Sequence, residues 1–290
     1  MTDNIFAEDY GRLIVQGADQ PGIVSRVSTV LAEHGANVVA LDQTTSDPSG
    51  GQFFQRTVFH LPELSVKREA LADALDQNLV DDLGLSYRLV EAKRQKRVAI
   101  LVSKSDHCML DLLWRQRRGE LRMAVPMVIS NHPDLGDDVR QFGIPFFHVP
   151  VEKNNKAAAE KEHLNLLKGN VDMVVLARYM QVLSGDFLEE VGVPVINIHH
   201  SFLPAFMGAG PYQRAKDRGV KLIGATAHYV TEDLDEGPII EQDVIRVSHR
   251  ESTREFQRRG ADVERSVLSR AVSWHCDDRV IRDGNTTVVF

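Results

Sequence analysis

A continuous apolar run at Val98-Ala-Ile-Leu-Val102 constrains the fold more than any other feature of this sequence. A strand with one wet face alternates apolar and polar residues, whereas an uninterrupted apolar strand is typical of a sheet covered on both faces. After this run, short apolar segments alternate with helical patterns as far as Val195 to His199. The alternation predicts an α/β unit with a doubly wound, mostly parallel sheet.

The last part of the chain predicts an addition to that sheet. Segments Ile223 to Val230 and Ile239 to Val247 come close together in the sequence, with Gly237-Pro238 between them. We expect these strands to join the sheet as an antiparallel pair. A long helix is predicted from about Thr253 to His275.

The segment from Gly11 to Ala92 follows a different order. Apolar runs typical of strands alternate with two stretches of helical spacing. The expected strands are 12–16, 37–41, 53–61 and 85–90, and the expected helices are 23–31 and 67–79. The resulting order, β-α-β-β-α-β, predicts a ferredoxin-like unit.

The 290 residues suffice for two domains of ordinary size. Between the two patterns lies Glu91 to Arg97, which is rich in charge and lacks Pro and Gly. Such a run is more often a solvated connection than a binding site. We therefore expect a first domain over 1–92, a charged linker over 93–97 and a second domain over 98–290.

The composition excludes several classes of partner. With 34 basic and 41 acidic residues, the formal charge is −7. Nucleic-acid-binding domains and polybasic membrane-binding segments need a basic excess or stripe, so we expect neither kind of partner. No apolar run approaches the ~20 residues that span a bilayer. The first nine residues lack the parts of a signal peptide, which predicts a cytoplasmic protein.

The densest polar cluster follows the strand that ends at His199. In open α/β sheets, ligands bind at the carboxyl ends of the strands. Asn197 and His199 alternate with Ile198, so both point to one face of this strand. Alternation suggests that His200 points away, but the sequence leaves open whether it joins the site. An amide and an imidazole on one face can stabilise a developing oxyanion. The alternative is a pair of buried polar groups with partners inside the fold.

A second cluster lies near Thr226 and His228, which share one face of a strand. The loop after it carries four acids, Glu232, Asp233, Asp235 and Glu236. Acids in a loop are usually solvated, but one of these could orient the His199 ring and activate a water. The residues alone do not choose among the four.

Two further kinds of site are disfavoured by spacing. The histidines of these clusters do not match the ligand spacings of metal sites, and Cys108 and Cys276 form no metal pair, so we expect no metal. After Val102 the sequence continues Ser103-Lys-Ser-Asp-His-Cys108, without glycine. A phosphate cradle needs close approach of backbone amides, which generally needs glycine.

The second domain resembles the folate-dependent formyltransferase superfamily. The resemblance rests on Asn197-x-His199, Ser201-x-Leu-Pro204 with Gly208, Asp235-x-Gly-Pro238 and the segment Leu176 to Ser184. It implies that Asn197, His199 and Asp235 are catalytic, and that Thr226 and His228 support Asp235. It also implies a folate pocket lined by Met180, Val182, Leu183, Leu188 and Val230.

The first domain resembles an ACT domain, through Asp19-Gln-Pro-Gly-Ile23 and Asn37. Together with Lys104-x-Asp-His-Cys108, Ile129-Ser-Asn-His132 and the terminal Thr-Val-Val-Phe290, the whole chain closely resembles the formyltetrahydrofolate deformylases. The resemblance implies hydrolysis of 10-formyltetrahydrofolate to tetrahydrofolate and formate, with no cofactor or metal. The loop Met207 to Pro211 is more glycine-rich than expected for the family and is expected to loosen the mouth of the site.

The resemblance makes the first domain a regulatory or assembly unit and the second the catalytic one. An effector site for an amino acid such as glycine or methionine is then expected at Asp19, Gly22, Ile23 and Asn37, at an interface within a homo-oligomer. A purely structural dimerisation module is the alternative. For the catalytic domain, the alternatives are formyl transfer to an amine and a folate or amino-acid sensor without turnover.

Overall fold

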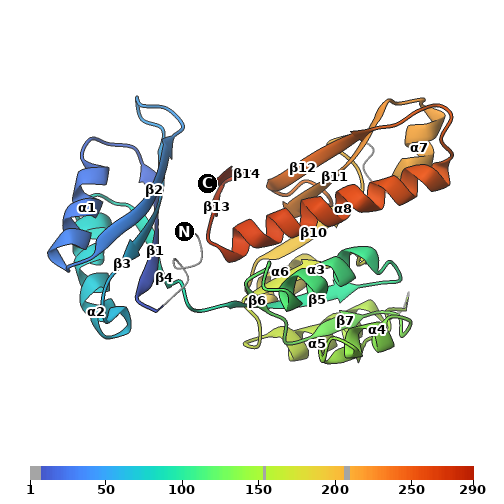
Figure 1. The fold of residues 1–290 in the computed structure, drawn as a ribbon, viewed down its shortest axis with the longest axis horizontal. Coiled ribbons are helices and arrows are strands. Elements are labelled where there is room, and N and C mark those ends of the chain that lie inside the picture. The colour runs from blue at the N-terminus through green and yellow to red at the C-terminus, as the bar shows by residue number, and fades with distance from the viewer. Residues whose placement is uncertain (1–7, 153–154, 206–209) are drawn as a thin grey trace. The chain divides into compact units, whose positions relative to one another are not determined.

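Figure 1 shows the computed structural model of the chain, which describes residues 8–152, 155–205 and 210–290. The chain divides into two compact units, which meet in the sequence between Gln95 and Lys96. Each unit has a sheet of its own. Among the described residues, no helix combines the length and the apolar character needed to cross a bilayer.

The first unit has the predicted β-α-β-β-α-β order. Its elements are β1 (Tyr10–Ala18), α1 (Ile23–Glu33), β2 (Asn37–Thr45), β3 (Gln52–His60), α2 (Leu64–Leu75), the π-helical turn η2 (Asp76–Asp81) and β4 (Ser86–Glu91). The four strands form an antiparallel sheet in the order β2-β3-β1-β4. Both helices pack their apolar residues, such as Val27 and Leu71, against one hydrophobic core.

The second unit carries the doubly wound sheet. Its elements are β5 (Lys96–Val102), α3 (His107–Arg117), β6 (Met123–Ala124), β7 (Val128–Ser130), α4 (Gly136–Arg140), β8 (Phe146–His148), α5 (Lys156–Leu167), β9 (Met173–Leu176), α6 (Gly185–Val191), β10 (Val195–His199), α7 (Pro211–Asp217), β11 (Leu222–Tyr229), β12 (Ile239–Arg246), α8 (Thr253–Cys276), β13 (Val280–Asp283) and β14 (Thr286–Val289). The strand order is β12-β11-β10-β9-β5-β7-β8.

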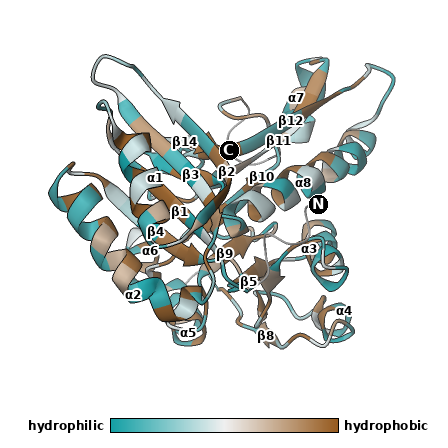
Figure 2. Cartoon of the chain, turned by 60° about the vertical axis from the view of Figure 1, so that its left-hand side comes forward, coloured by the Kyte–Doolittle hydropathy of each residue, from teal (hydrophilic) through white to brown (hydrophobic). Residues whose placement is uncertain are grey.

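Strands β10, β9, β5, β7 and β8 are parallel, and β11 and β12 extend the sheet antiparallel, as expected. The apolar run that begins at Val98 explains why this sheet is central. Val98, Ile100 and Val102 belong to a core cluster shared with α3 and α8, whereas Ala99 and Leu101 belong to a second cluster on the other face. Figure 2 shows the hydrophobic character of β5 and β9.

The structure differs from the sequence-based expectations in two places. Lys96 and Arg97, placed in the linker because of their charge, lie in β5. They are held there by ion pairs with Asp278 and Asp172 respectively, so their charge is used inside the second unit. The hairpin of β13 and β14 was not predicted, because its strands have four residues each and carry a weak pattern.

Candidate active site

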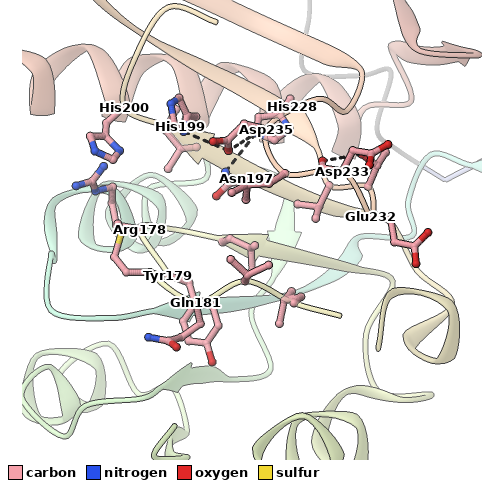
Figure 3. A pocket seen from close by; sticks show the side chains of 18 of the residues that line it. Arg178, Tyr179, Gln181, Asn197, His199, His200, His228, Glu232, Asp233 and Asp235 are labelled. Carbon is pink, nitrogen blue, oxygen red and sulfur yellow. Dashed lines mark hydrogen bonds and ion pairs between the residues drawn. The ribbon is translucent and has the colours of Figure 1, made fainter. Parts of the chain in front are cut away.

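A pocket of about 290 Å³ lies at the carboxyl ends of the parallel strands. Its walls come from the ends of β9 and β10, from residues 178–183 and from the loop 230–235 that follows β11 (Figure 3). This is the edge of an open α/β sheet at which ligands usually bind. Asn197, His199, His228 and Asp235 all line it.

His199 and Asp235 form a buried pair in this pocket. The Nδ1 atom of His199 lies 3.2 Å from Oδ1 of Asp235, and the two side chains are 6% and 7% exposed. Asp235 has φ of 60°, a left-handed conformation that costs a non-glycine residue roughly 1–3 kcal/mol. Among the four loop acids, the structure therefore brings Asp235 to the imidazole.

His228 fixes the orientation of the Asn197 amide. Nδ1 of His228 lies 2.9 Å from the carbonyl oxygen of Tyr229, so Nδ1 carries the proton and donates it. Burial lowers the pKa of His228, which favours the neutral ring with an unprotonated Nε2. That nitrogen lies 3.2 Å from Nδ2 of Asn197 and accepts its N–H. The second N–H of the Asn197 amide is left for a ligand.

The Nε2 atom of His199 is buried and has no hydrogen-bond partner within the described structure. Its other ring nitrogen is occupied by Asp235. An unsatisfied buried nitrogen in a native fold calls for an explanation, and one that lines a pocket is available to a substrate atom. Asn197 and His199 thus present two polar groups from neighbouring positions of one strand face.

Thr226 does not share the place expected for it beside Asp235. Its hydroxyl donates to the carbonyl oxygen of Ser201 and accepts from the backbone N–H of Leu203 and from Nε2 of Gln242. A hydroxyl has one donor and two acceptor sites, so these three hydrogen bonds use all of them. Thr226 therefore holds the segment after β10. His228 does lie beside Asp235, since its Nε2 is 3.8 Å from Oδ1 of Asp235, and it also contacts Asn197.

The structure brings together four of the five residues expected to line a folate pocket. Met180, Val182, Leu183 and Val230 line the pocket, and the first two are 56% and 53% exposed. Leu188 is not among its described lining residues. It lies in α6, where it packs against the core cluster on one face of the sheet.

The sequence left the place of His200 open, and strand alternation favoured a position away from the site. Strand alternation ends with β10 at His199, so it does not govern the next residue. His200 lines the pocket beside His199, with their ring centroids 5.3 Å apart. Burial and the nearby charge of Arg178 lower the pKa of His200 to about 3, so its ring is neutral.

A buried charge network adjoins this side of the pocket and was missed from the sequence. Glu264 of α8 accepts hydrogen bonds from His107 at 2.8 Å and from Tyr212 at 2.6 Å, and it pairs with Nε of Arg178 at 3.5 Å. Burial alone raises the pKa of Glu264, but the hydrogen bond from His107 and the charge of Arg178 lower it to about 2. A signal existed: Glu264 interrupts the apolar stripe of α8.

His107, Cys108 and Glu264 are the one group of described residues with potential metal-ligand atoms close together, within 4.8 Å. Burial raises the pKa of the Cys108 thiol well above its usual value, so this sulfur stays protonated. Arg178 already neutralises Glu264. Both features work against a bound cation at this place.

The expected effector residues lie in the first unit around the start of α1. Asp19 accepts a hydrogen bond from the Thr45 hydroxyl, and Gly22 precedes α1 with a left-handed φ of 95°. Asn37 is exposed at the start of β2. Ile23 is only 1% exposed and belongs to the hydrophobic core, so its side chain is not available to a ligand. The residues Met207 to Ala209 of the glycine-rich loop lie outside the described residues.

Comparison with known proteins assigns both units. A family model described as formyl transferase matches residues 96–272, and an ACT domain model matches residues 11–76. The chain is 60% identical over 282 residues to a formyltetrahydrofolate deformylase of Mycobacterium bovis, with 97% of this chain and 91% of the relative covered.

Solved structures support the same assignment. A formyltetrahydrofolate deformylase of Pseudomonas syringae superposes with a TM-score of 0.90 at 44% identity, and the match covers 97% of this chain and 94% of that one. A glycinamide ribonucleotide transformylase of Symbiobacterium toebii matches with a TM-score of 0.64 at 29% identity, over 68% of this chain and 94% of that one.

Proposed function

The chain belongs to the formyltetrahydrofolate deformylase family, which makes it a hydrolase of 10-formyltetrahydrofolate, and we propose that Asn197, His199 and Asp235 carry out this hydrolysis. The observation that carries the proposal is the buried His199–Asp235 pair beside an amide whose orientation is fixed. These groups lie at the carboxyl ends of the strands, in a pocket with apolar walls at Met180 and Val182.

The first step is the attack of water on the formyl carbon. As the new C–O bond forms, the carbonyl electron pair moves to the formyl oxygen, which becomes negative. The free N–H of the Asn197 amide and an N–H at Nε2 of His199 stabilise that oxygen. Asp235 accepts the hydrogen bond from Nδ1 of His199 and so orients the ring, with Nε2 turned to the substrate.

The second step is the cleavage of the bond between the formyl carbon and N10 of the folate. Asp235 positions the attacking water and accepts its proton, and the proton then passes to N10 as the amine leaves. The products are tetrahydrofolate and formate, so atoms and charge balance with one water consumed and one proton released. Burial of Asp235, at 7% exposure, keeps bulk water from competing for this proton.

The segment after β5 supports hydrolysis rather than transfer to a phosphorylated amine. Ser103 donates to Asn131 and accepts from the backbone N–H of Met180, and His107 is held by Glu264. These side chains are engaged inside the fold, and the segment has no glycine to let a phosphate approach its amides. A phosphorylated amine that accepts the formyl group would therefore find no phosphate-binding site in this segment.

The remaining assignments are proposals as well. The folate is the substrate, and the three polar side chains provide what the reaction needs without a cofactor or metal. The ACT unit would bind an amino acid such as glycine or methionine through Asp19, Gly22 and Asn37, and would join copies of the chain into a homo-oligomer. A cytoplasmic location stays a prediction of the sequence.

One assay tests the proposed function. The full chain is incubated with 10-formyltetrahydrofolate, and formate and tetrahydrofolate are measured with and without an added amine such as glycinamide ribonucleotide. Release in the absence of the amine is expected. Activity only with the amine would show a transferase, and folate binding without turnover would show a sensor.

The effector proposal has its own test. Calorimetry with glycine and with methionine, together with rate measurements, is expected to show binding and a change of rate for at least one of them. No heat and no change of rate with either amino acid would leave the ACT unit an assembly module.

A further inference from the structure

We propose that Arg178 and His200 form a binding site for the small carboxylate anion that the reaction releases. This inference rests on the proposed function, because formate is the product of hydrolysis. Formate is a planar carboxylate anion. The guanidinium of arginine is the side-chain group whose geometry suits a carboxylate best. The site is part of the catalytic pocket but separate from the groups assigned to the chemistry.

Arg178 provides the guanidinium of this site. It is the only Lys or Arg among the described residues that line the pocket. Its Nε and Nη1 atoms are buried and make no hydrogen bond within the described structure, apart from the ion pair of Nε with Glu264. Because the guanidinium carries five N–H donors, this leaves donors for an anion.

His200 completes one side of the site. In Figure 3 the guanidinium of Arg178 lies beside the His200 ring. Burial and the charge of Arg178 lower the pKa of His200 to about 3, so the ring stays neutral and can donate one N–H. The acids Glu232 and Asp233 lie on the other side of the catalytic groups in the same view. The side chains of Arg178 and His200 thus lie on the side of the catalytic groups away from these two acids.

The fold holds Arg178 in place at some cost. Arg178 has a left-handed φ of 64°, which a residue with a side chain adopts only when the surroundings enforce it. Its backbone carbonyl accepts from the N–H of Ser103, and its side chain is held by Glu264. Glu264 is itself fixed by His107 and Tyr212. A strained backbone and a dedicated counter-ion are typical of a preorganised binding group.

The test measures formate binding to the full chain in two ways: by calorimetry with sodium formate and by inhibition of hydrolysis by added formate. Arg178→Gln is expected to weaken formate binding by about 10- to 100-fold, the effect of losing a charge-assisted hydrogen bond. Arg178→Lys keeps the charge but loses the planar fork of donors. Its affinity for formate should therefore lie between those of the wild type and Arg178→Gln. Arg115→Gln, which removes an arginine paired with Asp111 on α3, is the matched control and should bind formate like the wild type.

Removal of Arg178 leaves Glu264 buried without its cation, and that variant can fail to fold. The double variant Arg178→Gln/Glu264→Gln removes both charges and is expected to lose formate binding while it keeps a cooperative unfolding transition. Unchanged formate affinity in a folded Arg178 variant would overturn the inference, even if hydrolysis proceeds. A rise in the KM for 10-formyltetrahydrofolate with unchanged formate inhibition would also overturn it, since Arg178 would then serve the folate. Absence of hydrolysis in the wild type would instead reject the proposed function.

Discussion

Oδ1 of Asp235 lies 3.2 Å from Nδ1 of His199, and both side chains are almost completely buried. The pair joins the end of a parallel strand to a loop that connects two antiparallel strands. Because Nδ1 of the ring is occupied by the carboxylate, Nε2 is the nitrogen that faces a substrate. The proposed chemistry depends on this division of the two ring nitrogens.

Asp235→Asn should abolish turnover and retain folate binding. The amide has nearly the same shape as the carboxylate but cannot accept a proton from water. Turnover is measured by formate release, and folate binding by fluorescence titration. Glu236→Gln, a neutralisation in the same loop, serves as the control. Turnover close to that of the wild type would remove Asp235 from the mechanism.

Asn197→Ala should lower kcat by about 10²- to 10³-fold, as the loss of one oxyanion donor does in other hydrolases. KM should change much less, because this donor acts mainly in the transition state. Steady-state kinetics separate the two effects. If kcat falls by less than about threefold, the amide does not stabilise the oxyanion.

Met180→Ala should raise the KM for 10-formyltetrahydrofolate with little effect on stability. Met180 lines the pocket and is 56% exposed, so its truncation removes ligand contact without opening the core. Leu188→Ala makes the matched comparison, since Leu188 packs against the core instead. That variant should unfold at a lower denaturant concentration and keep the wild-type KM. The opposite pattern would place the folate on α6.

His200→Gln should make stability less sensitive to acid. The pKa of His200 is about 3 in the folded chain, against about 6.5 in an unfolded chain. Between these values the unfolded chain binds a proton that the folded chain does not, so stability falls as pH falls below about 6.5. The variant should reduce that slope by at most ~1.4 kcal/mol per pH unit.

Urea unfolding at several pH values between about 6.5 and 5 measures this slope. His249→Gln is the control, because His249 is exposed. An equal slope for His200→Gln and the wild type would contradict the burial of a neutral ring at this position.

Gly237→Ala should be far more damaging than Gly185→Ala. A Cβ at Gly237 would overlap the backbone carbonyl oxygen of Tyr229, which cannot move without the strand, whereas one at Gly185 meets the flexible end of the Glu232 side chain. We expect Gly237→Ala to cost ~1–3 kcal/mol of stability and to lower kcat by displacing Asp235. Urea unfolding and formate release test both effects. Similar values for the two variants would show that the loop adapts.

The fold could be predicted in outline because its signals are local. The apolar run from Val98 to Val102 indicates burial on both faces, and the alternation after it indicates the parallel sheet. The hairpin of β13 and β14 could not be predicted, since strands of four residues carry too few positions to establish a period. The charges of Lys96 and Arg97 indicated solvent, but their partners Asp278 and Asp172 are far away in the sequence.

In the candidate site, too, local features could be predicted and long-range contacts could not. Asn197 and His199 could be placed on one strand face from their spacing alone. The meeting of His199 with Asp235 depends on a left-handed loop residue and on the pairing of three strands, which no local pattern contains. Arg178 and Glu264 were missed because their ion pair joins a turn after β9 to the middle of α8. Only the interruption of an apolar stripe hinted at it.

The register between β10 and β11 has a consequence for protein engineering. Asn197 is directly opposite His228, and the loop that carries Asp235 continues from the same strand. The reacting groups thus belong to one hairpin-like module, while Arg178 and the segment after β5 come from elsewhere in the sheet. Recombination could therefore exchange the segments around this module, such as the one after β5, to admit new formyl acceptors. The module that carries the reacting groups would stay unchanged.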